Sequence, residues 1–198
     1  SDDYRTWTVK IRPGIYFTDD PAFKGQRREL VAADYVYAFK RIVDPKNKSP
    51  VSSGILETKF VGLAELRDDA VKNNKPFDYD RELPGIRAID RYTLRFTLEQ
   101  PRPRLLETLA QPDLYGAVAR EVVEFYGDKI DAHPVGTGPF RLKQWRRSSL
   151  IVLERSPFYR ELFAGLDLDE VNSLPTINKA RMMKAFDCLN TAGLKLDE

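Results

Sequence analysis

Gly85-Ile-Arg-Ala-Ile-Asp-Arg-Tyr-Thr-Leu-Arg-Phe-Thr-Leu98 contains the clearest strand pattern in the chain. In its second half, large apolar and polar residues alternate strictly, which is the period of a strand with one buried face. The large residues of this half are Tyr92, Leu94, Phe96 and Leu98. Ile86 and Ile89 belong to a first strand, and Asp90-Arg91 form the turn between the two. The stretch therefore predicts an antiparallel β-hairpin.

Two segments nearer the N-terminus carry the next strongest patterns. Residues 6–11 alternate in the same way and predict another strand. Residues 32–43 place large apolar side chains three and four positions apart, which predicts an amphipathic helix. Asp44-Pro45 ends this helix, because proline disfavours helical dihedral angles in the residue before it. Together these elements predict an α/β protein of the α+β type, with a small mixed or antiparallel sheet and packed helices.

The rest of the chain predicts shorter elements. Residues 44–54 hold two prolines and three serines and are predicted to be a surface loop. A helix at 60–72 is expected to turn Phe60, Leu63, Ala64 and Val71 inward. The remaining predicted elements are helices at 104–110, 120–126 and 176–191 and a second hairpin with strands at 140–145 and 150–155.

Composition excludes several classes of protein. The chain has 198 residues, of which 42% are hydrophobic, so it is long enough to bury a core. Its formal net charge of +2 is far from the concentrated basicity of a nucleic-acid-binding protein, so no nucleic acid is expected as a partner. No apolar run approaches the roughly 20 residues that span a bilayer. One Cys and one His leave no disulfide framework and no multi-thiolate metal site.

Several isolated polar residues are candidates for a functional site. His133 lies in Asp131-Ala132-His133-Pro134 without a nucleophile motif, which predicts a loop histidine with no chemistry. Cys188 lies beside apolar residues and is predicted to pack as a small hydrophobe. Adjacent carboxylates rarely converge on one site, because neighbouring side chains point in different directions. The acid pairs 2–3, 19–20 and 68–69 therefore predict neither a metal site nor catalysis.

The segment Gly136-Thr137-Gly138-Pro139-Phe140 invites comparison with a phosphate-binding loop, because glycines let backbone amides approach a phosphate. Its context does not fit, since a strand follows where a helix is needed and Pro139 lacks an N–H donor. The segment is instead predicted to be a tight turn that enters the strand, with φ values that glycine adopts freely.

Five segments, taken in order, resemble the family 5 extracellular solute-binding proteins of ABC importers, a group that includes the periplasmic oligopeptide- and dipeptide-binding proteins. Each segment alone is a weak signal, but their order and spacing are specific. The segments are WTVKIRPGIYF (7–17), AADYVYAFKR (32–41), IDRYTL (89–94), PVGTGPF (134–140) and VLERSPFY (152–159). Val31 departs from the resemblance, because it stands where the family has a helix-capping Thr, a cap worth about 1 kcal/mol.

The resemblance also implies how the chain is organised. Intact members of the family are more than twice this length, and the resemblance fades near Val171. We therefore expect residues 1–160 to form a sub-domain of one lobe of a periplasmic binding protein type 2 fold. Residues 161–198 are expected to be a C-terminal helical extension that departs from the family pattern.

The function that the resemblance implies is transport rather than catalysis. The intact protein is expected to capture oligopeptides or similar small solutes between two lobes and deliver them to ABC permease subunits. This takes place at the periplasmic or extracellular face of a bacterial membrane, which the protein meets only through the transporter or a lipid anchor. No catalytic residue, metal or cofactor is expected, and no ligand-binding residue is assigned. Gly136 to Phe140 are expected to position the sub-domain where it rejoins the main lobe.

Two other functions stay open at this point. A nucleic-acid or anion-binding module predicts that four arginines converge on one face: Arg27, Arg28, Arg146 and Arg147. A small hydrolase predicts a Ser or Asp within hydrogen-bond reach of the His133 ring.

Overall fold

The computed structural model describes residues 3–73 and 75–157, and its central element is a three-stranded antiparallel sheet. β1 (Thr6–Lys10) and β2 (Ile86–Asp90) both pair with β3 (Thr93–Thr97), so the strand order is β1-β3-β2. Leu94 and Phe96 of β3 are buried, as their alternating pattern requires. The predicted hairpin at 85–98 and the predicted strand at 6–11 are both confirmed.

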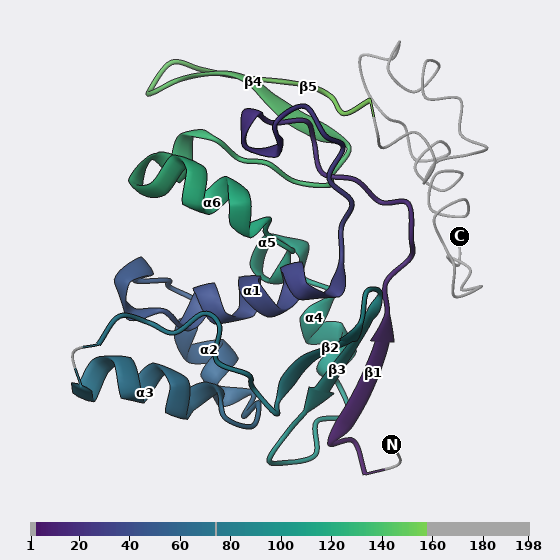
Figure 1. The fold of residues 1–198 in the computed structure, drawn as a ribbon, viewed down its shortest axis with the longest axis vertical. Helices are drawn as coiled ribbons and strands as arrows, with labels where there is room; N and C mark the ends of the chain where they lie inside the picture. Colours follow the sequence, from purple (N-terminus) through teal and green to yellow (C-terminus); the bar gives the residue numbers. More distant parts are fainter. Residues whose placement is uncertain (1–2, 74, 158–198) are drawn as a thin grey trace, which may run out of the picture.

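α1 (Ala32–Val43) packs on the sheet and has the bounds that the sequence predicts. Its Phe39 lies against Phe96 of β3, with ring centroids 5.6 Å apart, and against Phe60 at the same distance. In Figure 1, α1 runs between the sheet and α6 (Arg120–Tyr126). The main hydrophobic core therefore forms where α1 meets the three strands. Its buried members are Ala32, Phe39, Val43, Ile55, Phe60, Leu63, Leu66, Leu83, Ile86, Leu94, Phe96, Leu98, Leu105 and Tyr115.

The segment 44–54 corrects one prediction. It contains the 3-10 helix η2 (Pro45–Asn47) and the start of α2 (Ser52–Glu57), so it is not wholly a loop. Asp44 caps η2, because its Oδ1 accepts from the Lys46 amide at 2.9 Å. α2 forms because it buries Ile55 completely in the main core. Proline and serine marked the ends of these short helices rather than an irregular loop.

α3 (Leu63–Asn73) also differs from its prediction, since it begins three residues later than expected. Phe60 lies outside the helix and forms an isolated β-bridge with Leu98. A helix that starts at Leu63 turns Leu66 inward, and Val71 is consequently 53% exposed. The expectation that Val71 faces the core is therefore wrong.

A second, smaller hydrophobic cluster lies beneath α6. α4 (Leu105–Leu109) and α6 confirm the predicted helices, and α5 (Pro112–Tyr115) lies between them. Gly127, with φ of 52°, ends α6 and begins the 3-10 helix η3 (Gly127–Ala132). The buried members of this cluster are Phe17, Phe23 of the 3-10 helix η1 (Pro21–Phe23), Leu30, Ala119 and Val122.

The predicted second hairpin is confirmed as β4 (Phe140–Arg146) and β5 (Leu150–Arg155), which pair antiparallel around a turn at 147–149. Figure 1 shows this hairpin on the far side of α6 from the three-stranded sheet. The predicted helix at 176–191, with Cys188, and the proposed extension at 161–198 lie outside the described residues.

Candidate functional site

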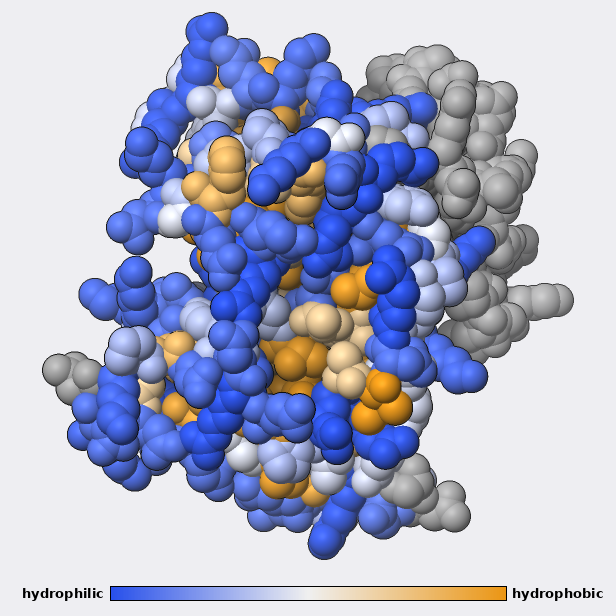
Figure 2. Space-filling view, in the orientation of Figure 1, coloured by the Kyte–Doolittle hydropathy of each residue, from blue (hydrophilic) through white to orange (hydrophobic). Residues whose placement is uncertain are grey.

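A cavity of about 510 Å³ opens between α1, α6 and the segment 79–88. Its floor is apolar and is formed by Val36, Leu83 and Ile86, whereas charged side chains form its walls. Figure 2 shows this contrast, with apolar residues gathered between α1 and β2 and hydrophilic residues around them. The helix periodicity builds one wall, because residues three and four apart on α1 share a face. The α1 residues that line the cavity are Ala33, Asp34, Val36, Tyr37 and Lys40.

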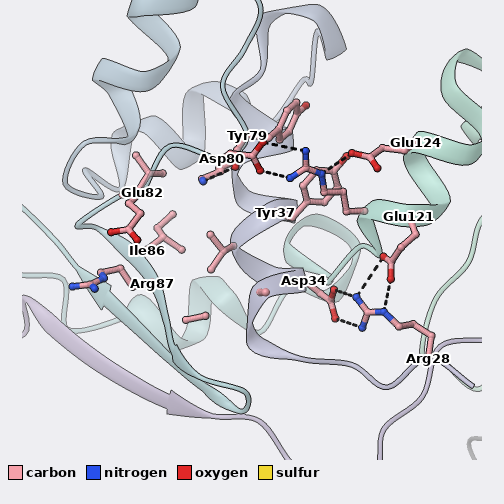
Figure 3. Close-up of a pocket in the computed structure, with 16 residues that line it drawn as sticks. Arg28, Asp34, Tyr37, Tyr79, Asp80, Glu82, Ile86, Arg87, Glu121 and Glu124 are labelled. Carbon is pink, nitrogen blue, oxygen red and sulfur yellow. Dashed lines mark hydrogen bonds and ion pairs between the residues drawn. The ribbon is translucent and has the colours of Figure 1, made fainter.

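Arg28 joins α1 to α6 at one end of the cavity (Figure 3). Its Nη2 lies 2.6 Å from Asp34 Oδ1, and its Nε lies 2.6 Å from Glu121 Oε1. Burial lowers the pKa of Arg28, but the hydrogen bonds and charges of the two carboxylates outweigh burial and hold this pKa well above its usual value. The guanidinium therefore stays charged and fixes the distance between the two helices.

Asp34 has a second role at the start of α1. The side chain is buried, with 3% of the residue exposed, and its Oδ2 accepts from the Val31 amide at 2.8 Å. This bond satisfies one backbone donor ahead of the helix, although Val31 itself offers no side-chain cap. Asp34 thus replaces part of the capping that the valine removes.

Arg120 forms a similar cluster at the other end of the cavity. It makes ion pairs with Asp80 and with Glu124, the latter at 2.6 Å between Nε and Oε1. These hydrogen bonds raise the pKa of Arg120, and the bond to Arg120 lowers the pKa of Asp80. The guanidinium also lies over the Tyr37 ring, 5.8 Å from its centroid. α6 is therefore tied both to α1 and to the segment 79–88.

Lys40 is a buried lysine that holds the segment 79–88 through backbone oxygens. Only 4% of Lys40 is exposed, and its Nζ donates to the carbonyl oxygens of Tyr79 at 2.8 Å and Arg81 at 2.6 Å. Burial lowers the pKa of Lys40. The Tyr79 hydroxyl donates to Asp44 at 2.6 Å, and burial together with this bond raises the pKa of Tyr79. These contacts fix the wall of the cavity against α1.

The cavity is suited to structural support more than to chemistry. Its strongest charges are paired with one another, and Glu82 and Arg87 lie at the wall away from both arginine clusters (Figure 3). The described residues that line it include no Ser, Cys or His, so they provide no Ser–His or Cys–His pair. The cavity has an apolar floor and polar walls, as a binding pocket does.

The structure places the segment Gly136 to Phe140 beside the N-terminal loop. The amide and the hydroxyl of Thr18 both donate to the Gly136 carbonyl oxygen, at 2.9 and 3.1 Å. The Pro139 carbonyl oxygen accepts from the Ser156 amide at 2.8 Å, which closes the entry to β4. Neither Gly136 nor Gly138 has a positive φ, so the conformational reason predicted for these glycines is wrong.

Comparison with known proteins identifies the family. The model of the bacterial extracellular solute-binding proteins, family 5 Middle, matches residues 1–187. The chain belongs to this family. It is 31% identical over 175 residues to the periplasmic oligopeptide-binding protein OppA of Salmonella typhimurium, a match that covers 87% of this chain and 29% of that protein. It is 30% identical over 158 residues to the dipeptide-binding protein of Escherichia coli.

Solved structures give the same result for the fold of this family 5 chain. OppA of Burkholderia pseudomallei matches with a TM-score of 0.59 and 29% identity over 79% of this chain and 28% of that one. The substrate-binding domain of an oligopeptide ABC transporter from Bacillus anthracis matches with a TM-score of 0.64 and 27% identity over 82% of this chain and 29% of that one. The chain therefore spans less than a third of the length of these relatives.

The four arginines predicted for an anion-binding face do not converge in this family 5 chain. Arg28 is neutralised inside the cavity by Asp34 and Glu121. Arg27 lies over the Tyr16 ring, 4.1 Å from its centroid. Arg147 lies on the β4–β5 turn and pairs with Asp131 at 3.3 Å, next to Arg146 at the end of β4. Nothing in this arrangement favours a nucleic-acid interface.

His133 and the acid pairs take structural positions. The His133 ring stacks on the Tyr126 ring, with centroids 3.8 Å apart and planes 5° from parallel. Asp20 accepts from the Tyr126 hydroxyl at 3.0 Å. Asp68 pairs with Lys72. In residues 3–73 and 75–157, no three His, Cys, Asp or Glu side chains gather as a metal site requires, and no helix has the length and apolar character that a membrane crossing needs.

Sequence reasoning missed the residues that build the cavity. Asp34 and Lys40 are polar residues inside an amphipathic helix, and the pattern alone predicts that such residues are exposed to solvent. Asp34 did carry a signal, because an acidic residue three positions after a helix N-cap is typical of a capping box. Lys40 carried none, since its partners are backbone oxygens 39 and 41 residues away.

Proposed function

We propose that this chain is part of the substrate-binding component of an ABC importer. The intact protein captures oligopeptides or similar small solutes and delivers them to a membrane permease at the periplasmic or extracellular face of a bacterial membrane. The observation that carries the proposal is the family match over residues 1–187, together with relatives named for oligopeptide, dipeptide and glutathione binding. Capture follows from lobe closure, since ligand contacts made only in the closed state shift the population toward it.

Within this proposal, the 198 residues supply a supporting sub-domain and are not an enzyme. Residues 1–160 form the sub-domain, and residues 161–198 form the extension. Two observations support a passive role. The cavity between α1 and α6 has both of its arginine clusters neutralised internally, and its lysine is occupied by two carbonyl oxygens. Charged groups that are already paired within the protein are less available to pair with the termini of a peptide.

Isothermal titration calorimetry tests the passive role. Short peptides with free termini, and glutathione separately, are titrated into the 198-residue chain and into OppA of Salmonella typhimurium as the positive control. We expect heat of binding for the control with its peptides and none for this chain. Micromolar binding of any of these ligands to the chain would show that the sub-domain itself carries a solute site.

A hybrid protein tests the transport assignment. Residues 3–157 of this chain replace the matched part of the Salmonella protein, and peptide affinity is measured on the folded hybrid. We expect an affinity within about tenfold of the parent, a change of about 1.4 kcal/mol or less. A folded hybrid that has lost peptide binding entirely would contradict the assignment.

A further inference from the structure

The outward face of the three-stranded sheet carries a row of polar residues that crosses all three strands. Residues directly opposite each other in an antiparallel pair lie on the same face. Arg95 of β3 is opposite Thr8 of β1 on one side and opposite Arg87 of β2 on the other. All three residues are exposed, whereas Leu94 and Phe96, the neighbours of Arg95 along β3, are buried in the main core. We name Thr8, Arg95 and Arg87 the arginine row.

The two arginines of this row lie side by side without a counter-charge. The Cβ atoms of opposite residues are about 5 Å apart, and like charges in such positions destabilise a sheet. Among the residues that the structure describes, neither Arg87 nor Arg95 has a partner in an ion pair or a side-chain hydrogen bond. The next row on the same face is balanced, because it holds both Lys10 and Asp90. The arginine row therefore carries two positive charges that no described side chain compensates.

Protection of a sheet edge does not explain this pair of arginines. Charged side chains on an edge strand keep other chains from pairing with it. Arg87 lies on the edge strand β2 and fits that role, but Arg95 lies on β3, which is the central strand. Because β3 already has a partner on each side, Arg95 protects no edge. A ligand that brings negative charge to both side chains explains both positions.

The chemistry of the row favours a phosphate monoester as that ligand. A guanidinium is a rigid fork whose N–H groups match the oxygen atoms of a carboxylate or a phosphate. A phosphate monoester has three terminal oxygens and a charge of about −1.5 to −2 at pH 7, so it can engage both forks and neutralise both charges. A carboxylate offers two oxygens and a single charge. The Thr8 hydroxyl adds a further donor at the end of the row.

We propose that Arg87, Arg95 and Thr8 bind the phosphate group of a soluble phosphate monoester on the outward face of the sheet. A lipid surface fits less well, because membrane-binding segments use clusters of about four to eight basic residues and this row has two. Arg87 also lines the edge of the cavity beside α1, but its guanidinium points away from both arginine clusters there (Figure 3). The site uses neither of those clusters and does not depend on the transport assignment.

Titration with small phosphates tests the site. The arginine Nε–H signals of the 198-residue chain are followed by NMR at constant ionic strength while inorganic phosphate, methyl phosphate, dimethyl phosphate or acetate is added. We expect saturable shifts at Arg87 and Arg95 with inorganic phosphate and methyl phosphate. Dimethyl phosphate and acetate should bind at least about fivefold more weakly, because each carries one charge. Equal affinity for all four probes overturns the proposal, and so does the absence of a saturable shift with the first two.

Variants separate the two forks from a general attraction between charges. Arg87→Gln and Arg95→Gln should each weaken the binding of methyl phosphate at least about fivefold, and Arg95→Lys should weaken it too, because lysine keeps the charge but lacks the fork. Lys10→Gln is the matched control, since it removes one charge from the balanced row of the same face. Its effect should stay within about twofold. An equal loss in Lys10→Gln, or full affinity in Arg95→Lys, overturns the proposal.

Urea denaturation of the same variants gives a second measurement and shows that they fold. In chloride, Arg95→Gln should be at least as stable as the native chain, because it removes the repulsion between two adjacent positive charges. Phosphate stabilises folded proteins in general, but it should raise the denaturation midpoint more for the native chain than for Arg95→Gln. An equal rise in both would contradict binding at the row.

Vesicles distinguish a soluble ligand from a membrane. The chain is centrifuged with vesicles of phosphatidylglycerol and phosphatidylcholine, and we expect it to stay in the supernatant at about 0.15 M salt, because two exposed arginines supply little attraction after screening. Sedimentation that is lost in Arg87→Gln and Arg95→Gln would identify lipid headgroups as the occupant and overturn the choice of a soluble monoester. Peptide binding by the hybrid protein is measured separately, so a failure of this site and a failure of the transport assignment are distinguishable.

Discussion

The amide of Gly85 donates to the carbonyl oxygen of Val61 at 2.9 Å, and a Cβ at residue 85 would overlap the Val61 backbone. The carbonyl oxygen of Gly85 also accepts from the Thr97 amide at 2.9 Å, so residue 85 cannot move away from Val61 without breaking the end of β3. We expect Gly85→Ala to lower the free energy of unfolding by about 1–3 kcal/mol, as overpacking does elsewhere. Urea denaturation measures this change.

Gly54 supplies the matched control for that substitution. It lies inside α2, and nothing lies within 4 Å of a Cβ placed there. Gly54→Ala is expected to raise the free energy of unfolding by up to about 1 kcal/mol, because alanine is the better helix former. Equal effects of the two substitutions on the free energy of unfolding would show that the backbones of Gly85 and Val61 can move apart to accept a Cβ.

Arg28 is expected to be the most costly surface-accessible arginine to remove. Arg28→Ala leaves the buried Asp34 carboxylate without its cation and separates α1 from Glu121 of α6. Because Arg28 is partly exposed, we expect a loss of about 2–4 kcal/mol, at or below the range for fully buried pairs. Arg104→Ala is the control, since that side chain is 86% exposed and 3.9 Å from Glu107. Its effect should lie within about 0.5 kcal/mol. Similar losses for both variants would contradict the role of Arg28.

The hydrogen bonds of Glu29 predict how the stability of the chain depends on pH. Its carboxylate accepts from Arg91 at 2.8 Å, from the Gly14 amide at 2.8 Å and from the Tyr92 hydroxyl at 2.9 Å. The Arg91 bond first, and then the Gly14 bond, lower the pKa of Glu29 from 4.5 to about 2. A lowered pKa in the folded state means that the stabilisation is fully present above the usual value and is lost as the pH falls toward 2.

Urea denaturation between pH 7 and pH 2 measures this effect. We expect the native chain to be more stable than Glu29→Gln at pH 7 and the difference to shrink steadily below about pH 4.5. A difference that stays constant down to pH 2 would mean that Glu29 titrates as in the unfolded chain.

Gly136 and Gly138 are expected to tolerate alanine, in contrast to what their family motif suggests. Neither has a positive φ, and nothing lies within 4 Å of a Cβ at either position. Each substitution should change the free energy of unfolding by less than about 0.5 kcal/mol. Gly127→Ala is the control, because φ of 52° at that position strains any side chain, at a cost of about 1 kcal/mol or more. Thermal unfolding of the three variants measures these changes. If Gly136→Ala were the least stable of the three, the prediction for Gly136 would be contradicted.

The elements that the sequence predicted well are those whose burial has a simple period. α1 has the bounds that its pattern predicts, because one broad face of it meets the sheet. β3 follows its alternation for the same reason, because Leu94 and Phe96 are buried. The β4–β5 hairpin follows its alternation as well, although most of its large apolar side chains are exposed. The prediction was wrong at Phe60, because Phe60 forms a β-bridge with Leu98 and does not belong to a helix.

The hydrophobic pattern of the sequence could not predict the cavity, because the contacts around the cavity join residues far apart in the chain. Arg28 meets Glu121 across 93 positions, and Arg120 meets Asp80 across 40. A single sequence shows each of these residues as an ordinary charged surface position. Only the fold brings them together, because it places α1, α6 and the segment 79–88 around one cavity.

The strand order β1-β3-β2 also determines when β1 can pair during synthesis of the chain. Thr6 pairs with Thr97, so β1 leaves the ribosome well before β3 and must wait for β3 before it has its partner. α1 and α3 are synthesised in between and have only a partial sheet to pack on until then. Closing so long a loop slows folding and leaves apolar side chains of β1 and α1 open to aggregation in the meantime. Synthesis that stops shortly before residue 97 is therefore expected to yield a chain that a chaperone must hold.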